Sequence, residues 1–414
     1  MEEKFEFTKK AKKNLLTMTG AGILLVILGI VLMNVGGHGE HEGGEALNHV
    51  LHWSKRLWAN LWLNNVWFTG IALIGVFFLS MQYVAWVGWS VSIKRVPEAF
   101  GYFLPVAGVL MLIIFLFAHH DLFHWTHEYL YDKNDARFDE ILDEKSSFLN
   151  IPFFTSRMVG YFVLWFGLFW LIRKYSLAED ISGGLEHFNK LRMICAFFMV
   201  IFGVTSSMAA WDWIMSIDAH WFSTMIGWYV FASWFVSGLC VITLIVIHLK
   251  QNGYLSIVNE NHIHNLALFV FAFSVFWTYL WFCQFFLIYY ANIPEESIYF
   301  VQRLLSDHYA PWFFAILIIN FIFPFIALMT RDSKRHMAIV KIVCMLVLFG
   351  HWLDFYLMVM PGTVHEQGGI GFMEIGVTVI YIGIFLYTVL FALSKASLIA
   401  KHHPMLEESV HHSI

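Results

Sequence analysis

Residues 222–248 read FSTMIGWYVFASWFVSGLCVITLIVIH, a run without a single Asp, Glu, Lys or Arg. A transmembrane α-helix needs about 20 predominantly apolar residues, which is longer than the apolar runs of most soluble cores. The whole chain of 414 residues has this character, because 59% of its residues are hydrophobic and only 13% are charged. Soluble domains carry about 25% charged residues. The sequence therefore predicts an all-α integral membrane protein.

Ten apolar segments of this kind follow one another along the chain. They cover residues 15–34, 66–92, 100–118, 157–173, 191–211, 222–248, 265–290, 309–330, 337–360 and 371–394. Unpaired backbone polar groups cannot face lipid, so each segment is expected to be a helix. The strands of a β-barrel would instead alternate in hydropathy over about ten residues.

Lys and Arg are unevenly distributed between the segments that join these spans. With the N-terminus in the cytoplasm, 18 of the 25 fall in cytoplasmic segments: Lys4, Lys9, Lys10, Lys12, Lys13, Lys94, Arg95, Arg173, Lys174, Lys190, Arg192, Lys250, Arg331, Lys334, Arg335, Lys341, Lys395 and Lys401. The other 7 are Lys55, Arg56, Lys133, Arg137, Lys145, Arg157 and Arg303. The positive-inside rule therefore predicts that both termini are cytoplasmic.

Spans two to five and spans six to nine are expected to form two four-helix bundles, with spans one and ten at their flanks. Trp211-Asp212-Trp213 ends span five and Trp352-Leu353-Asp354 lies in span nine, which favours a weak internal repeat. The predicted units are 1–65, the first span and an outward Gly- and His-rich loop; 66–211, a bundle with an acidic outward loop at 119–156; 212–360, the second bundle; and 361–414, the tenth span and a cytoplasmic tail.

Two further predictions concern the extramembrane pieces. Residues 52–63 (HWSKRLWANLWL) are expected to form an interfacial helix in the first outward loop. The tail 401–414 (KHHPMLEESVHHSI) is expected to be disordered.

His351 and Asp354 are the sharpest candidates for chemistry. They lie three residues apart inside span nine, so they share one helical face in its outward half. Ionisable groups within a bilayer are costly and mark function by default. The pair could accept a proton, bind a quinol head group or relay protons outward. It could equally be a buried pair that only ties helices together.

Asp212 and Glu374 are the next candidates. Asp212 lies at the outer end of span five and matches Asp354 in the other half, although an interfacial Asp needs no functional explanation. Glu374, early in span ten, could pair with either group or face the lipid head groups.

A histidine-rich segment follows span three. His119, His120 and Asp121 could belong to an outward-facing proton or quinone site. The spacing of His120, His124 and His127 would place them on one helical stripe, which can ligate zinc or copper but is also typical of a polar interfacial helix. We assign no metal to it.

No redox cofactor is expected in this chain. Its four cysteines, Cys195, Cys240, Cys283 and Cys344, are isolated in apolar stretches without a CxxC pair. Iron–sulfur ligation and c-type haem attachment are thereby excluded. A haem b inside a bundle needs two histidines at one depth, and only His351 lies well inside a span.

These features resemble a known family. The stretch AAWDWIMSIDAHWFSTMIGWYVFASWF (209–235), with HHDLFHW (119–125) and GHWLD (350–354), is similar to the NrfD/polysulfide-reductase membrane subunits. Within that family the chain looks like the shorter, ActF-type subunit of bacterial alternative complex III, a quinol:cytochrome c oxidoreductase. The resemblance covers residues 66–394.

The resemblance implies a respiratory subunit in the bacterial inner membrane without a redox centre or catalytic residue of its own. Haem c and iron–sulfur clusters would belong to partner subunits: a multihaem cytochrome c and an iron–sulfur protein. A sister membrane subunit, and in some assemblies a terminal oxidase, would complete the complex. Bound phospholipids are expected, quinone is a candidate ligand, and no nucleic acid is expected. The alternatives are a stand-alone secondary transporter and a purely structural scaffold.

Overall fold

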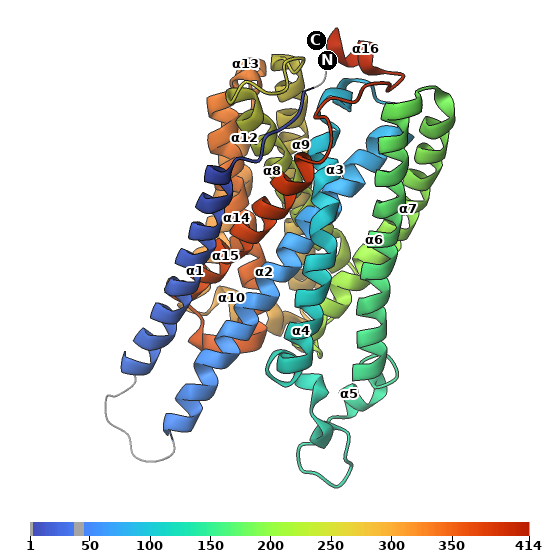
Figure 1. Cartoon of the computed structure of the whole chain (residues 1–414). Coiled ribbons are helices and arrows are strands. Elements are labelled where there is room, and N and C mark those ends of the chain that lie inside the picture. Colours follow the sequence, from blue (N-terminus) through green and yellow to red (C-terminus); the bar gives the residue numbers. More distant parts are fainter. Residues whose placement is uncertain (1–2, 37–44, 414) are drawn as a thin grey trace.

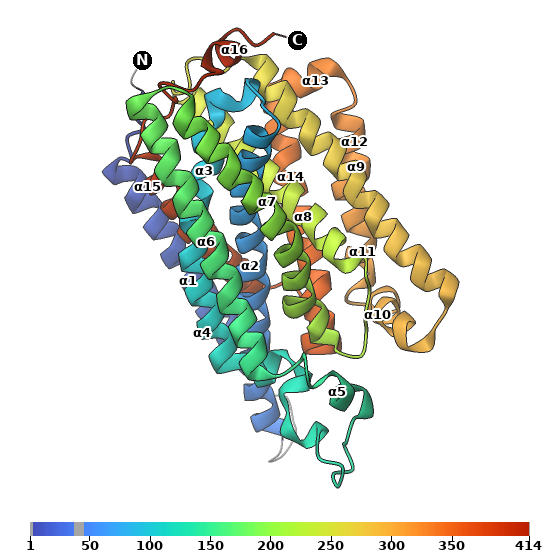
Figure 2. The same ribbon diagram turned by 90° about the vertical axis from the view of Figure 1, so that its right-hand side faces the viewer.

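The structure is a computed structural model that describes residues 3–36 and 45–413. It is an elongated helical bundle with both termini at one end, which we call the terminus end; the opposite end carries the loop around α5, and we call it the α5 end (Figures 1 and 2). The described residues form no strand, and they include ten helical segments long and apolar enough to cross a membrane. The predicted all-α, ten-span fold is confirmed.

The ten spans, in chain order, are built from α1 (Lys9–Gly36), α2 (Glu45–Val84), α3 and α4 (Arg95–Phe100 and Leu104–Leu122), α6 (Ile151–Ser182), α7 (Leu185–Trp213), α8 (Ile226–Gln251), α9 (Glu260–Ala291), α11 and α12 (Ala310–Leu317 and Phe323–Ala327), α14 (Met337–Val364) and α15 (Phe372–Leu393). Short helices outside the spans are α5 (Glu140–Lys145), α10 (Pro294–Leu304), α13 (Arg331–Arg335) and α16 (Leu406–Val410). A π-helical turn, Ile318–Ile322, joins α11 to α12.

Helices α2 and α8 form the centre of the molecule. Their most apolar windows are 89% and 83% buried, whereas that of α1 is only 11% buried. Helix α2 packs against α4 and α7 on one side and against α8, α14 and α15 on the other. Contacts link α2, α4, α6 and α7 into one ring and α8, α9, α11–α12 and α14 into a second. Helix α1 packs chiefly against α15.

The second span differs from its prediction. It covers Trp53–Val84, and residues 53–63, expected to form an interfacial helix, continue the same helix α2 into the core. The difference arises because Asn60, Asn64 and Asn65 lower the local hydropathy yet are fully buried. Each amide has an internal partner: Asn65 Nδ2, for example, donates to Ala107 O at 3.0 Å. Amide nitrogens satisfied in this way are compatible with a span, although Oδ1 of Asn60 and of Asn65 has no partner among the described residues. Residues 37–44 of the predicted loop lie outside the described residues.

The C-terminal tail is ordered, so the prediction of disorder was wrong. Helix α16 packs against the turn that follows α2. Buried Ser409 Oγ accepts a hydrogen bond from Ser92 N at 3.0 Å and donates one to Trp89 O at 2.8 Å. Asn259 Nδ2, at the start of α9, donates to His412 O at 2.8 Å. The polar composition of the tail suggested disorder, but its polar groups form hydrogen bonds that hold it against the terminus end.

Glycines allow the central helices α2 and α8 to approach each other closely. A methyl group on Gly70 would come within 1.9 Å of the Trp234 ring, and one on Gly238 within 2.3 Å of Ile74. Small residues at such crossings are the usual means by which membrane helices pack.

We expect Gly70→Ala to lower the free energy of unfolding by about 1–3 kcal/mol, because the core between α2 and α8 would be overpacked. Thermal unfolding in detergent, followed by tryptophan fluorescence, measures this effect. Gly203→Ala on α7 is the matched control, since an added methyl group there meets nothing within 4 Å. Equal stabilities of the two variants would contradict the close approach.

Candidate functional site

Asp354 lies at the centre of a polar cluster inside the second ring of helices. Its side chain is 1% exposed. The carboxylate accepts hydrogen bonds from Tyr229 OH, from Ser233 Oγ at 2.9 Å and from Trp277 Nε1 at 3.0 Å. These donors come from α8 and α9, and all three are neutral. Among the described residues, no Lys or Arg forms an ion pair with Asp354.

His351 extends this cluster by one turn of α14. Its Nδ1 lies 2.9 Å from Ser233 Oγ and 3.9 Å from Asp354 Oδ2. A serine hydroxyl has one proton, so when Ser233 donates it to Asp354 the imidazole must donate from Nδ1. The other nitrogen, Nε2, is buried and has no partner within the described part of the chain. The predicted face shared by His351 and Asp354 is therefore present, and Ser233 bridges the pair.

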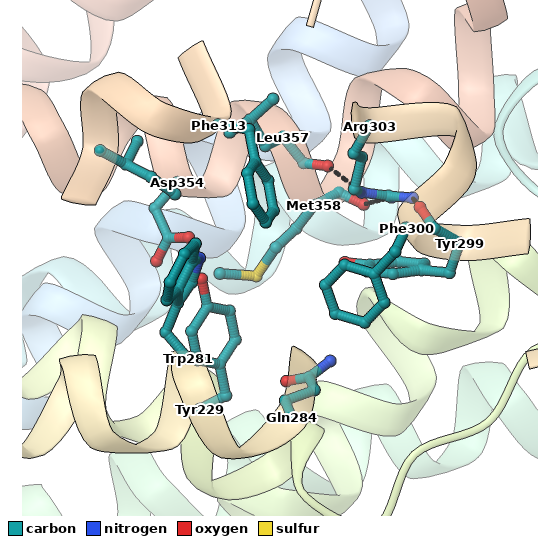
Figure 3. Close-up of a pocket in the computed structure, with 11 residues that line it drawn as sticks. Tyr229, Trp281, Gln284, Tyr299, Phe300, Arg303, Phe313, Asp354, Leu357 and Met358 are labelled. Carbon is teal, nitrogen blue, oxygen red and sulfur yellow. Dashed lines mark hydrogen bonds between the residues drawn. The ribbon is translucent and has the colours of Figure 1, made fainter. Parts of the chain in front are cut away.

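A narrow pocket adjoins Asp354 (Figure 3). Its walls are mainly aromatic, and its polar members are Tyr229, Gln284, Tyr299, Arg303 and Asp354. The free space accommodates about one water molecule. The wall nearest the α5 end comes from α10.

Arg303 is held in the wall of this pocket by a backbone carbonyl of α14. Pro361 has no backbone N–H, so it leaves the carbonyl of Leu357 without its helical partner. Arg303 Nε donates to that carbonyl at 2.8 Å, and Nη1 donates to Tyr299 O at 2.7 Å. The guanidinium also stacks on the Tyr299 ring, 3.3 Å from its centre. Arg303 thus joins α10 to α14.

Asp212, the candidate in the first ring, has a different environment. It is 1% exposed, so it is buried within the protein, in the last turn of α7. Arg157 of α6 holds it in two parallel bonds, Nε to Oδ2 at 2.9 Å and Nη2 to Oδ1 at 2.8 Å. Tyr161 OH donates a third bond at 2.9 Å. A bidentate guanidinium neutralises this carboxylate.

Glu374 is also neutralised by a cation. Arg56 Nε lies 2.6 Å from its Oε1, and Asn60 Nδ2 donates to the same oxygen at 3.0 Å. Its Oε2 accepts a bond from Gly371 N at 2.8 Å, which closes the first turn of α15. These contacts tie α15 to α2 and account for Glu374 as a structural residue.

The histidine-rich segment is not one helical stripe. Helix α4 ends at Leu122, so His124 and His127 lie on the irregular chain that follows. The rings nevertheless gather at the α5 end, with centroids 5.1 Å apart for His120 and His127 and 5.8 Å for His124 and His127. Burial, and then repulsion from neighbouring histidines, lowers the pKa of His127. No group of three potential ligands within metal-binding geometry occurs among the described residues.

His119 and Asp121 complete the set of predicted candidates. His119 Nδ1 lies 3.1 Å from Phe115 O in its own helix, and its ring centroid is 4.1 Å from that of His120. Asp121 is only partly buried, on the last turn of α4. The structure therefore keeps these residues together, but on a different span from the His351–Asp354 cluster.

A buried charge network near the terminus end was missed in the sequence. Three cations and three carboxylates meet between α3 and α6: Lys94, Arg95, Arg173, Glu98, Glu179 and Asp180. The bonds include Lys94 Nζ to Glu179 Oε2 at 2.7 Å and Arg173 Nη1 to Glu98 Oε1 at 3.0 Å.

The tail closes over this network. His403 packs between Tyr83 and Phe188, and burial together with nearby Lys94 and Arg95 lowers its pKa to about 2. His403 is therefore neutral at physiological pH. A sequence signal for the network existed, since residues 173, 176, 179 and 180 share one stripe of α6. It was obscured because these charges had been counted as loop residues.

The described part of the chain has five buried Asp and Glu residues: Glu98, Glu179, Asp212, Asp354 and Glu374. Four of them are paired with Lys or Arg. Asp354 is the exception. The fold and this site together define a ten-span membrane protein with one buried carboxylate that lacks a cationic partner. The sequence matches no protein-family model, and no curated protein matches it.

We expect Arg157→Met to lower the free energy of unfolding by about 3–5 kcal/mol, because it leaves Asp212 buried and unpaired. The double variant Arg157→Met/Asp212→Leu removes both charges and should recover most of that loss. Denaturant unfolding in detergent compares the two. A single variant no less stable than the double variant would contradict the ion pair.

Proposed function

We propose that this chain is an integral membrane subunit of a respiratory quinol:cytochrome c, or quinol:oxidase, oxidoreductase, and that Asp354 and His351 carry protons in it. The observation that carries the proposal is the contrast between Asp354 and the four other buried carboxylates, each of which has a Lys or Arg partner. The resemblance of 209–235, 119–125 and 350–354 to the ActF-type NrfD-like subunits supports the assignment to such a complex.

The physical argument concerns the charge of Asp354. An ionised carboxylate in a bilayer interior is costly unless a cation compensates it. Asp354 has only the neutral donors Tyr229, Ser233 and Trp277. Its negative form is therefore held by hydrogen bonds rather than by a direct ion pair with Lys or Arg, and a proton can neutralise it. A residue balanced in this way can bind and release a proton during turnover, whereas a carboxylate locked to Arg cannot.

His351 supplies a second proton-carrying group in the same hydrogen-bonded array. Ser233 joins His351 Nδ1 to Asp354 Oδ2, each at 2.9 Å. The hydroxyl can donate to either side, so a proton that arrives at one group can be passed to the other through a concerted shift of the serine proton. Three side chains from α8 and α14 thus form a short proton relay.

The proposal assigns electron transfer to neighbouring subunits. The four cysteines form no disulfide in the described structure, and Cys240 and Cys344, whose thiols are in hydrogen-bonding contact, supply two ligands where an iron–sulfur cluster takes four. The pocket beside Asp354 has room for about one water molecule, which is too small for a quinone ring. Quinol oxidation, haem c and the iron–sulfur clusters would belong to a sister membrane subunit, a multihaem cytochrome and an iron–sulfur protein, with a terminal oxidase as a further partner.

The proposed orientation places the terminus end in the cytoplasm of a bacterial inner membrane. The excess of Lys and Arg in the segments assigned to that side supports it. Asp354 then lies in the outward half of α14, where protons from quinol oxidation would be released. Bound phospholipids would cover the exposed apolar faces, such as that of α1.

We expect Asp354→Asn to lower the number of protons released per quinol in the assembled complex, because the variant side chain cannot carry a proton. Quinol oxidation then either slows or continues without that proton release. The number of protons released per quinol, measured with a pH indicator outside sealed vesicles, is the readout. Asp212→Asn is the matched control: it alters the other buried, tryptophan-flanked Asp, and we expect proton release per quinol to be unchanged. Unchanged proton release in Asp354→Asn would remove this residue from the mechanism.

Purification in a mild detergent tests the assignment to a complex. We expect subunits with c-type haem absorbance to co-purify with the chain. A single colourless polypeptide with transport activity would instead establish the alternative, a stand-alone secondary transporter.

A further inference from the structure

We propose that the pocket between Asp354 and Gln284 holds one water molecule, and that this water is the outward exit for the proton of Asp354. The inference rests on the proposed function of Asp354 as a proton carrier. It adds a route and a further residue, Gln284, which acts by positioning the water (Figure 3).

Gln284 has an unmet hydrogen-bonding requirement. Its side chain is on α9, 3% exposed, and Oε1 has no partner among the described residues. A buried amide oxygen without a donor is unfavourable by about 1–3 kcal/mol. The same side chain lines the pocket that Asp354 lines. The missing donor is therefore best supplied from within the pocket.

The chemistry of the pocket selects water. Gln284 Oε1 and the Asp354 carboxylate are both acceptors, so a molecule between them needs two donors and must fit a space of about one water. Water meets both conditions. A small cation would also bind two oxygen ligands, and the sodium dependence measured below separates these two occupants.

The position of the pocket gives the route its direction. Tyr299, Phe300 and Arg303 of α10 line it, and α10 lies nearer the α5 end than the terminus end (Figure 2). Arg303 is held in place by the carbonyls of Leu357 and Tyr299. Burial raises the pKa of Tyr299 to about 12, so its hydroxyl stays protonated.

The water in the pocket takes up the proton of Asp354 directly. When Asp354 is protonated, its carboxyl O–H donates to the oxygen of the water, and the water donates to Gln284 Oε1. The O–H bond of Asp354 breaks as the water oxygen gains that proton, and in the same concerted step the water gives one of its own protons to the oxygen of a second water molecule, through which it reaches bulk solvent. Asp354 is left as a carboxylate, which now accepts a hydrogen bond from the same water.

The test is the rate at which the Asp354 carboxyl exchanges its proton for deuterium in the protein purified in its native assembly. Infrared difference spectroscopy follows the protonated carboxyl band, which Asp354→Asn identifies by removing it. We expect Gln284→Leu to slow exchange about tenfold, since one water-mediated hydrogen bond is lost. Gln284→Glu keeps an acceptor oxygen and should restore the rate to within about twofold.

The matched control is Gln302→Leu on α10, which removes another buried amide oxygen without a partner, but one that does not line the pocket. We expect exchange in this variant to equal that of the unmodified protein. An unchanged rate in Gln284→Leu would overturn the inference while leaving Asp354 as a proton carrier. A rate that depends on sodium concentration would also overturn it, in favour of a cation site. If no band is removed by Asp354→Asn, both the inference and the proposed function fail.

Discussion

The cost of placing charge inside a bilayer is the constraint on which this structure depends. Five carboxylates are buried in the described part of the chain, and four are compensated by Lys or Arg at hydrogen-bonding distance. These ion pairs join different helices: Arg157 to Asp212 joins the consecutive helices α6 and α7, and Arg56 to Glu374 joins α2 to α15, which are distant in sequence. Against this pattern, the lack of a direct Lys or Arg partner for Asp354 among the described residues is a departure that needs an explanation.

The same constraint accounts for a difference between the two rings of helices in how their buried polar groups are compensated. In the first ring, charge is balanced at both ends, by Arg157–Asp212 toward the α5 end and by the six-residue network between α3 and α6 toward the terminus end. In the second ring, polarity is supplied mainly by neutral groups such as Ser233, Tyr229 and Gln284. The first ring is thus a charge-compensated frame, and the second contains Asp354, the group that we propose changes its charge.

The sequence was sufficient for the number of spans because the length and hydropathy of a span are properties of a single segment. It also placed His351 and Asp354 on one face of a helix, which requires only the helical repeat.

The sequence could not predict which buried charges are paired, because Arg157 was assigned to a loop while its side chain turns inward to Asp212. Helix α2 was mislocated for a related reason, since Asn60 and its neighbours resemble a polar loop until their partners on other helices are known. The tail was misjudged because the acceptors that fasten it belong to α9 and to the turn after α2.

The central claim is that Asp354 changes its protonation state as the protein works. The most direct measurement is infrared difference spectroscopy on the intact assembly when quinol is added. The account predicts a change in the carboxyl C=O stretching region that disappears in Asp354→Asn and persists in Asp212→Asn. A difference spectrum without a carboxyl band, or one that is unaltered in Asp354→Asn, would contradict it.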